Sequence, residues 1–223
     1  MFSTDPFSLI VLLVGLSLLP FLAMIATSYL KIVVVMGLIR NALGIQSIPP
    51  NMVINALALI LTFYIMSPMV EEGWNILREG TKEGDAKVLY ETDLAVKASE
   101  PFRQFLIRQT DERQVAFFTR TAEKLWAKPD ADGIEVPATV DRNSYYVLIP
   151  SFCVSELTKA FQIGFLVYLP FIAIDIIISN ILLAMGMMMV SPVTISLPFK
   201  LLLFVMVNGW TLLIQGLVQS YVK

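Results

Sequence analysis

Long apolar runs alternate with one charge-rich segment along this chain of 223 residues. Residues 7–30 and 52–70 carry no charge, and two further apolar stretches follow at residues 160–183 and 201–222. A run of about 20 apolar residues is long enough, as a helix, to cross the hydrocarbon core of a bilayer. The pattern therefore predicts four membrane-spanning helices.

The charge-rich segment covers residues 71–142 and holds 15 acids and 11 bases, which is 26 of the 34 charged groups in the chain. Within it, apolar side chains such as Phe102, Phe105 and Leu106 recur at helical spacing. We therefore expect a charged, mostly helical extramembrane insert between apolar hairpins at residues 1–70 and 143–223. The predicted fold class is all-α, a multi-spanning helical membrane protein.

Prolines predict interruptions in the later apolar runs, and the first run needs to be distinguished from a signal peptide. Pro150 and Pro170 predict that the long apolar stretch after residue 143 is kinked or split. Residues 190–199 contain two prolines and three hydroxyl residues, so we expect a non-helical turn there. The run at residues 7–30 is too long for a signal peptide and follows no basic residue, which favours a helix that is not cleaved.

The few charges outside the insert suggest an orientation. Lys31 and Arg40 follow the first apolar run, and the excess of basic residues in cytoplasmic loops makes them candidate membrane-interface anchors on that side. The insert then lies on the periplasmic side. Glu156 and Lys159 are expected near the outer interface.

Composition excludes several classes of protein. Hydrophobic residues make up 57% and charged residues 15%, and the mean hydropathy is +0.73, which argues against a disordered chain and most soluble enzymes. A net charge of −2 gives no sign of nucleic-acid binding. The chain has no histidine and one cysteine, Cys153, so histidine-based catalysis and cysteine-built metal sites are excluded. We expect no enzyme, no cofactor and no metal.

Asp175 is unusual because a carboxylate inside an apolar run is costly in a bilayer and usually faces a partner or a pore. With a turn at residues 190–199, Asp175 would be level with Asn208 and Thr211, while Lys200 would be too far away for a direct pair. We predict that Asp175, Asn208 and Lys200 are buried polar or interface residues. A structural contact is favoured over an ion-coupling role for Asp175, and both remain open.

A dense methionine cluster lies close to the expected turn. Because methionine is a flexible apolar side chain, these residues are either packed core or a deformable lining. Glycine and proline flank the cluster and weaken helix formation there. The residues are Met185, Met187, Met188 and Met189.

Three segments resemble a known family: RNALGIQSIPPN at residues 40–51, SELTKAFQIGF at 155–165, and the long apolar segment at 169–213. They are similar to the SctR subunit of the type III secretion injectisome, whose flagellar counterpart is FliP. The resemblance covers both apolar parts of the chain and not the insert. Asn208 departs from the pattern, in which an acidic residue often precedes the Gly-Trp pair.

The resemblance implies a function that composition does not show. SctR subunits form the core of an export apparatus in the bacterial inner membrane, with several copies, five expected, and with SctS and SctT. Unfolded secreted proteins pass through its channel, which the methionine cluster would constrict, and much of the assembly lies above the bilayer. The alternatives are the flagellar counterpart, a small-solute or ion transporter that uses Asp175, and a purely structural scaffold.

Overall fold

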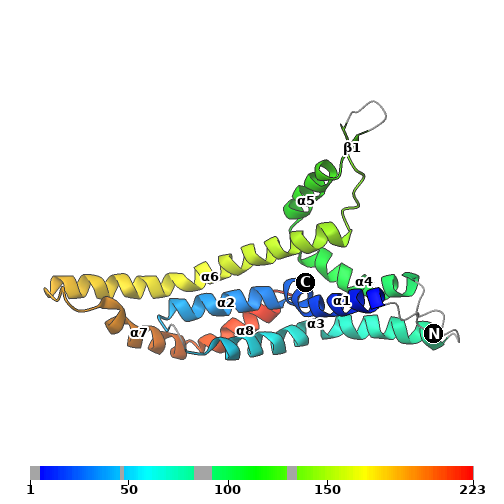
Figure 1. The fold of residues 1–223 in the computed structure, drawn as a ribbon. Helices are drawn as coiled ribbons and strands as arrows, with labels where there is room; N and C mark the ends of the chain where they lie inside the picture. Colours follow the sequence, from blue (N-terminus) through cyan, green and yellow to red (C-terminus); the bar gives the residue numbers. More distant parts are fainter. Residues whose placement is uncertain (1–5, 46–47, 83–91, 130–134, 223) are drawn as a thin grey trace.

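The computed structural model of the chain describes residues 6–45, 48–82, 92–129 and 135–222 (Figure 1). Within these residues the regular secondary structure is helical apart from two strands of two residues each, so the predicted all-α class is confirmed. The elements are α1 Pro6–Ile25, α2 Tyr29–Ala42, α3 Asn51–Lys82, α4 Thr92–Gln109, α5 Glu112–Leu125, β1 Lys128–Pro129, β2 Glu135–Val136, α6 Tyr145–Ala184, α7 Pro192–Met206 and α8 Gly209–Gln219.

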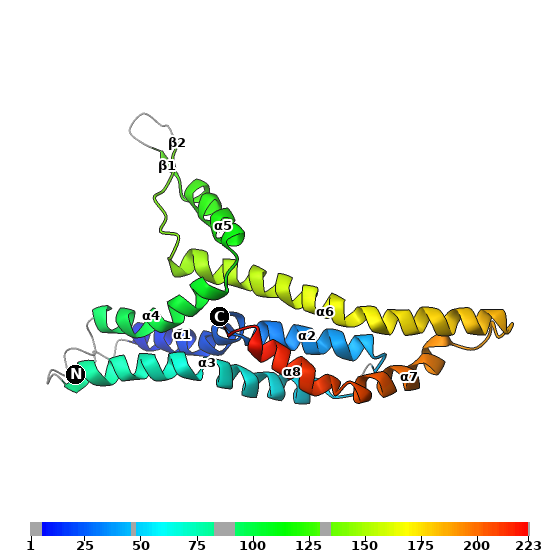
Figure 2. The ribbon, with the colours of Figure 1, turned by 180° about the vertical axis from the view of Figure 1, so that it is seen from behind.

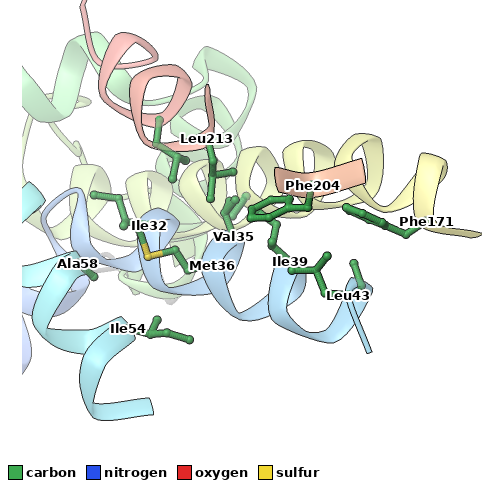
Figure 3. Close-up of a cluster of buried hydrophobic side chains, with 13 residues drawn as sticks. Ile32, Val35, Met36, Ile39, Leu43, Ile54, Ala58, Phe171, Phe204 and Leu213 are labelled. Carbon is green, nitrogen blue, oxygen red and sulfur yellow. The ribbon is translucent and has the colours of Figure 1, made fainter. Parts of the chain in front are cut away.

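Helix α2 is the centre of the bundle. Its apolar side chains meet α3, α6, α7 and α8 at once, and the close-up in Figure 3 shows Ile32, Met36 and Ile39 among partners from these helices. Apolar residues recur on several sides of α2, which is typical of a helix enclosed by protein. The core therefore depends on a helix of only 14 residues.

The α2–α6 contact is close because Gly164 has no side chain. A Cβ atom at this position would lie 2.3 Å from Cδ1 of Leu38 on α2. Gly37 on α2, by contrast, faces open space. Gly164 therefore sets how closely α2 and α6 approach each other.

Helix α6 runs without interruption for 40 residues, or about 60 Å. Pro150 and Pro170 both lie inside it, so of the two expected outcomes, a kink or a split, the split does not occur. Each proline removes one backbone hydrogen bond. Packing of α6 against α2, α4, α5 and α7 offsets that loss.

The four predicted spans are only partly present. Among the described residues, α3 and α6 are long and apolar enough to cross a membrane, and the bent pair α7–α8 counts as a third if taken as one span. The run at residues 7–30 is not one helix, because α1 ends at Ile25 and α2 begins at Tyr29. Ser28, in the break, and Lys31, just after it, are buried within the chain.

The predicted insert contains α4, α5 and the end of α3, whereas residues 83–91 and 130–134 lie outside the described part. Helix α3 continues across the expected boundary at residue 70. A second apolar cluster joins the insert to the bundle through Met66, Leu106 and Phe152. Both ribbon views show α5 and the strands standing off to the side of the bundle (Figures 1 and 2).

We predict that Gly164→Ala destabilises the chain by about 1–3 kcal/mol, because the added methyl group overpacks against Leu38. Leu38→Ala in the same chain should recover part of the loss, and thermal unfolding in detergent measures both. Gly37→Ala is the matched control and should be neutral or stabilising, since alanine favours helix more than glycine. Strictly additive effects of the two substitutions would contradict this account.

Candidate functional site

The methionine cluster lies in the loop between α6 and α7, at the end of the bundle far from the insert (Figures 1 and 2). The prediction of a non-helical turn over residues 190–199 is wrong, because α7 already begins at Pro192. Ser191 is the extended N-cap residue, and proline is well tolerated in the first helical turn. The loop therefore comprises residues 185–191 only.

Gly186 ends α6 in a Schellman motif. Its amide donates to the carbonyl of Leu183 at 3.0 Å, and the amide of Met187 donates to that of Leu182 at 2.9 Å. The motif needs a left-handed residue, and Gly186 has a φ of +74°. The helix end thus turns the following methionines out of the helix axis.

The four methionine side chains are exposed in the chain. Their exposed fractions are 67% for Met185, 40% for Met187, 82% for Met188 and 101% for Met189. They do not pack into the core of this chain, so the packed-core interpretation fails within the subunit. What remains is a flexible apolar tip that faces outward.

Asp175 and Lys200 form an ion pair directly behind this tip. Lys200 Nζ lies 2.6 Å from Asp175 Oδ2, and the hydroxyl of Ser196 donates to Asp175 Oδ1 at 2.6 Å. The expectation that Lys200 is too far from Asp175 is therefore wrong. Since the turn is centred near residue 188 and not near 195, positions 175 and 200 face each other across the hairpin.

Lys200 also ties the hairpin to the central helix. Its ammonium group is almost fully buried and donates to the carbonyl of Ala42 at 3.2 Å. Ala42 is the last residue of α2, where carbonyls lack helical partners and a positive charge is favourable. Asp175, at 33% exposure, remains partly open to the surroundings.

Asn208 is not a partner of Asp175. It occupies the left-handed region, with φ +51° and ψ +46°, between α7 and α8, and its side chain is exposed. Asparagine tolerates this conformation better than most residues. The two helices are bent by 60° at this point, so Asn208 forms the bend and Thr211, the other predicted partner, is exposed on α8.

Lys31 is not a membrane-interface anchor in this structure. Its Nζ lies 3.2 Å from Glu156 Oε2, with side-chain exposures of 1% for Lys31 and 0% for Glu156. The pair joins α2 to α6 inside the bundle. A single unpaired charge would be costly to bury here. The carboxylate of Glu156 on α6 compensates the charge of Lys31 in place of water.

Lys159 and Tyr221 complete this buried cluster. Lys159 Nζ lies 3.1 Å from Glu156 Oε1 and also donates to the carbonyl of Gln109 at the end of α4. The phenol of Tyr221 donates to Glu156, and Lys31 Nζ lies 3.5 Å from the centre of the Tyr221 ring. Burial and the Glu156 carboxylate raise the pKa of Tyr221, so the phenol stays protonated and acts as donor.

Arg40 closes the connection between α2 and α3. Its Nη1 donates to Asn51 Oδ1 at 2.5 Å and to the carbonyl of Pro49 at 3.4 Å. The side chain is half-buried in these contacts. These contacts tie the end of α2 to the start of α3, and a role of Arg40 at the membrane interface stays a prediction.

A cavity of about 520 Å³ opens in the bend between α6, α7 and α8. Every residue that lines it is apolar or glycine, including Phe171, Phe204 and Leu213, which Figure 3 shows beside α2. In the described part of the chain, no three acidic or cysteine side chains cluster in a way that could hold a metal ion. The arrangement can pack and seal, and it offers no chemistry for bond making.

Together these features define the class of the protein: it is an all-helical membrane protein with buried ion pairs and a flexible apolar tip. Residues 12–217 match the FliP family, and the chain belongs to that family. Its members are structural components of secretion apparatus and are not enzymes. The resemblance to SctR and FliP predicted from three segments is confirmed.

The chain is 48% identical to Yop proteins translocation protein R of Yersinia pestis over 221 residues, covering 97% of each chain. It is 46% identical to the hypersensitivity response secretion protein HrcR of Ralstonia nicotianae over 215 residues, covering 96% of each. A flagellar biosynthetic protein FliP of Pectobacterium carotovorum is 44% identical over 215 residues, which are 95% of this chain and 77% of that protein.

We predict that Glu156→Ala costs about 3–5 kcal/mol, because it leaves Lys31 buried without its carboxylate. The double variant Lys31→Met with Glu156→Leu should be much milder, since it removes both charges and keeps apolar volume. Denaturant titration of the purified chain in detergent measures the difference. Equal losses in the single and double variants would show that charge pairing is not what this site requires.

We expect Asp175→Asn to be milder than Asp175→Leu, because the amide still accepts hydrogen bonds from Ser196 and Lys200. Asp175→Leu leaves the buried ammonium of Lys200 without a counter-charge. Adding Lys200→Met to Asp175→Leu should restore much of the stability, as judged by assembly yield and thermal unfolding. If all three variants assemble like the parent, the pair has no structural role.

Proposed function

We propose that this chain is a core subunit of a type III secretion export apparatus that conducts unfolded proteins across the bacterial inner membrane. The observation that carries the proposal is the exposed methionine loop at the end of the α6–α7 hairpin. Membership of the FliP family supports the export role. The loop would line the narrowest part of the channel.

Methionine suits a seal that must also open. It has an apolar body, three rotatable side-chain bonds and no branch at Cβ, so neighbouring loops can fill irregular gaps. An apolar constriction excludes ions by dewetting, without a charged gate. A passing polypeptide can displace such side chains without breaking hydrogen bonds.

The exposed surface of the chain supports assembly into a larger complex. The accessible surface is 15477 Å², whereas a compact soluble monomer of 24.9 kDa exposes about 10,000 Å². In the most apolar windows of α3 and α6, only 22% and 11% of residues are buried within the chain. The remaining apolar surface needs lipid or protein neighbours.

In the proposed assembly, several copies of this chain, five by family expectation, surround a channel together with SctS and SctT. The Asp175–Lys200 pair and the Lys200 contact with α2 would hold each methionine loop at a fixed depth. In this proposal the insert lies on the periplasmic side of the membrane. Similarity to relatives named for Yop translocation and for the hypersensitivity response favours the injectisome over the flagellar branch.

We predict that alanine replacement of all four methionines leaves assembly intact and raises leakage of ions and small solutes. The side chains contribute little to the core of the subunit because they are exposed. Two measurements on one variant test this: the yield of complex with SctS and SctT, and the conductance of membranes that contain it. The residues are Met185, Met187, Met188 and Met189.

Replacement of Met24 and Met52 by alanine is a matched control, since both are exposed methionines outside the loop. It should leave conductance unchanged. An intact complex with no added leak in the loop variant would defeat the seal, and loss of assembly would assign the loop to subunit packing.

A further inference from the structure

The loop between α6 and α7 gathers four thioether groups within five residues and leaves them open to the surroundings. Met188 and Met189 are the most exposed of the four. Met36 and Met66, by contrast, are enclosed in the two apolar clusters of the bundle. A dissolved oxidant therefore reaches the methionines of the loop directly, whereas it reaches those of the clusters only when the bundle opens.

A hydroperoxide such as hydrogen peroxide converts a thioether into a sulfoxide in a single step. A lone pair on sulfur attacks one peroxide oxygen, the O–O bond breaks and an S–O bond forms. Sulfur loses two electrons, and the second peroxide oxygen accepts them and leaves as water with the proton from the first. The step uses no acidic or basic side chain, and residues 185–191 contain none.

The conformation of the loop does not depend on the thioether groups. The amide of Met188 donates to the carbonyl of Gly186 at 3.0 Å, and the amide of Val190 donates to the carbonyl of Met187 at 3.4 Å. The Schellman motif that ends α6 also consists of backbone hydrogen bonds. An oxygen added to sulfur breaks none of these bonds, so oxidation changes the polarity of the loop and leaves its fold in place.

A change in polarity is what an apolar seal tolerates least. A thioether is a weak hydrogen-bond acceptor, whereas a sulfoxide is polar and binds water. A constriction that excludes ions by dewetting loses this property when its lining holds water. Each copy of the chain brings four such groups to the seal, so the effect is multiplied in an assembly.

We propose that the methionine loop is an oxidation site at which a small hydroperoxide opens the seal by converting thioethers into sulfoxides. The inference rests on the proposed function of the loop as a seal. Methionine sulfoxide reductases return both sulfoxide epimers to the thioether, so the opening is reversible. The residues of the site are Met185, Met187, Met188 and Met189.

The first test measures where oxygen is added in the complex with SctS and SctT. Every sample carries Cys153→Ser, which removes the thiol as a competing site. After brief treatment with hydrogen peroxide, peptide mass spectrometry follows each methionine. The loop should react at least about ten-fold faster than Met36 and Met66, since enclosed side chains react only through rare openings. A loop that reacts no faster than these two residues would overturn the proposal.

The second test measures the conductance of vesicles that contain the complex. Peroxide should raise the conductance several-fold, and treatment with both types of sulfoxide reductase should reverse the rise. Leucine at all four loop positions keeps apolar side chains of similar volume and removes the sulfur. The conductance of this variant should not respond to peroxide, relative to its own untreated level.

Met24→Leu with Met52→Leu is the matched control, because it removes two exposed methionines outside the loop. It should keep the full response to peroxide. A response that persists in the loop variant, or that disappears in this control, would assign the effect to another residue and overturn the proposal. So would a leak that accompanies dissociation of the complex, as seen by native mass spectrometry.

The variant with alanine at the four loop positions separates failure of this site from failure of the seal itself. If the alanine variant leaks and the oxidised parent does not, the oxidation site is wrong and the seal stands. If neither leaks although the loop is oxidised, both proposals are wrong.

Discussion

The ion pair between Lys31 and Glu156 is the constraint on which the rest of the structure depends. It holds α2 against α6 at a depth where neither charge reaches solvent. The pair leaves no choice of register, because moving α2 by one turn would leave a buried ammonium and a buried carboxylate apart. Tyr221 and Lys159 add contacts from the C-terminal end and from α6 itself. Helix α2, once fixed in this way, supplies the surface on which α3, α7 and α8 pack.

A second buried charge, Lys200, fixes the part of the bundle that leads to the methionine loop. Lys200 joins Asp175 on α6 to the last carbonyl of α2, so a polar contact also ties the hairpin to the end of the central helix. Gly164 lets the two helices lie close enough for the attachment to form. Among the described residues, the methionine loop beyond it forms no ion pair. The position of Lys200 therefore separates the fixed part of the hairpin, around Asp175, from the flexible methionine loop beyond it.

Much of this fold could be predicted from the pattern of apolar residues, and the errors have physical causes. Apolar runs located α3 and α6, but hydropathy does not distinguish a helix enclosed by protein from one in lipid, so the burial of α2 was missed. Lys31 looked like an anchor because its partner lies 125 positions away. The correct position of the turn between α6 and α7 could have been predicted from the sequence. Gly186 is typical of a helix end and Ser191-Pro192 of a helix start, which together indicate a loop at 185–191. That loop would have paired positions 175 and 200.

The bend at Asn208 limits what can surround the end of the chain. Helices α7 and α8 have 15 and 11 residues, or about 22 and 16 Å, and a bilayer core is about 30 Å thick. Neither arm alone spans that thickness. Joined in a straight line they would exceed it, but the left-handed residue between them turns the second arm by 60°. In this shape the pair fits beside neighbouring protein better than across lipid, and the apolar hollow inside the bend is open to a neighbour's side chains.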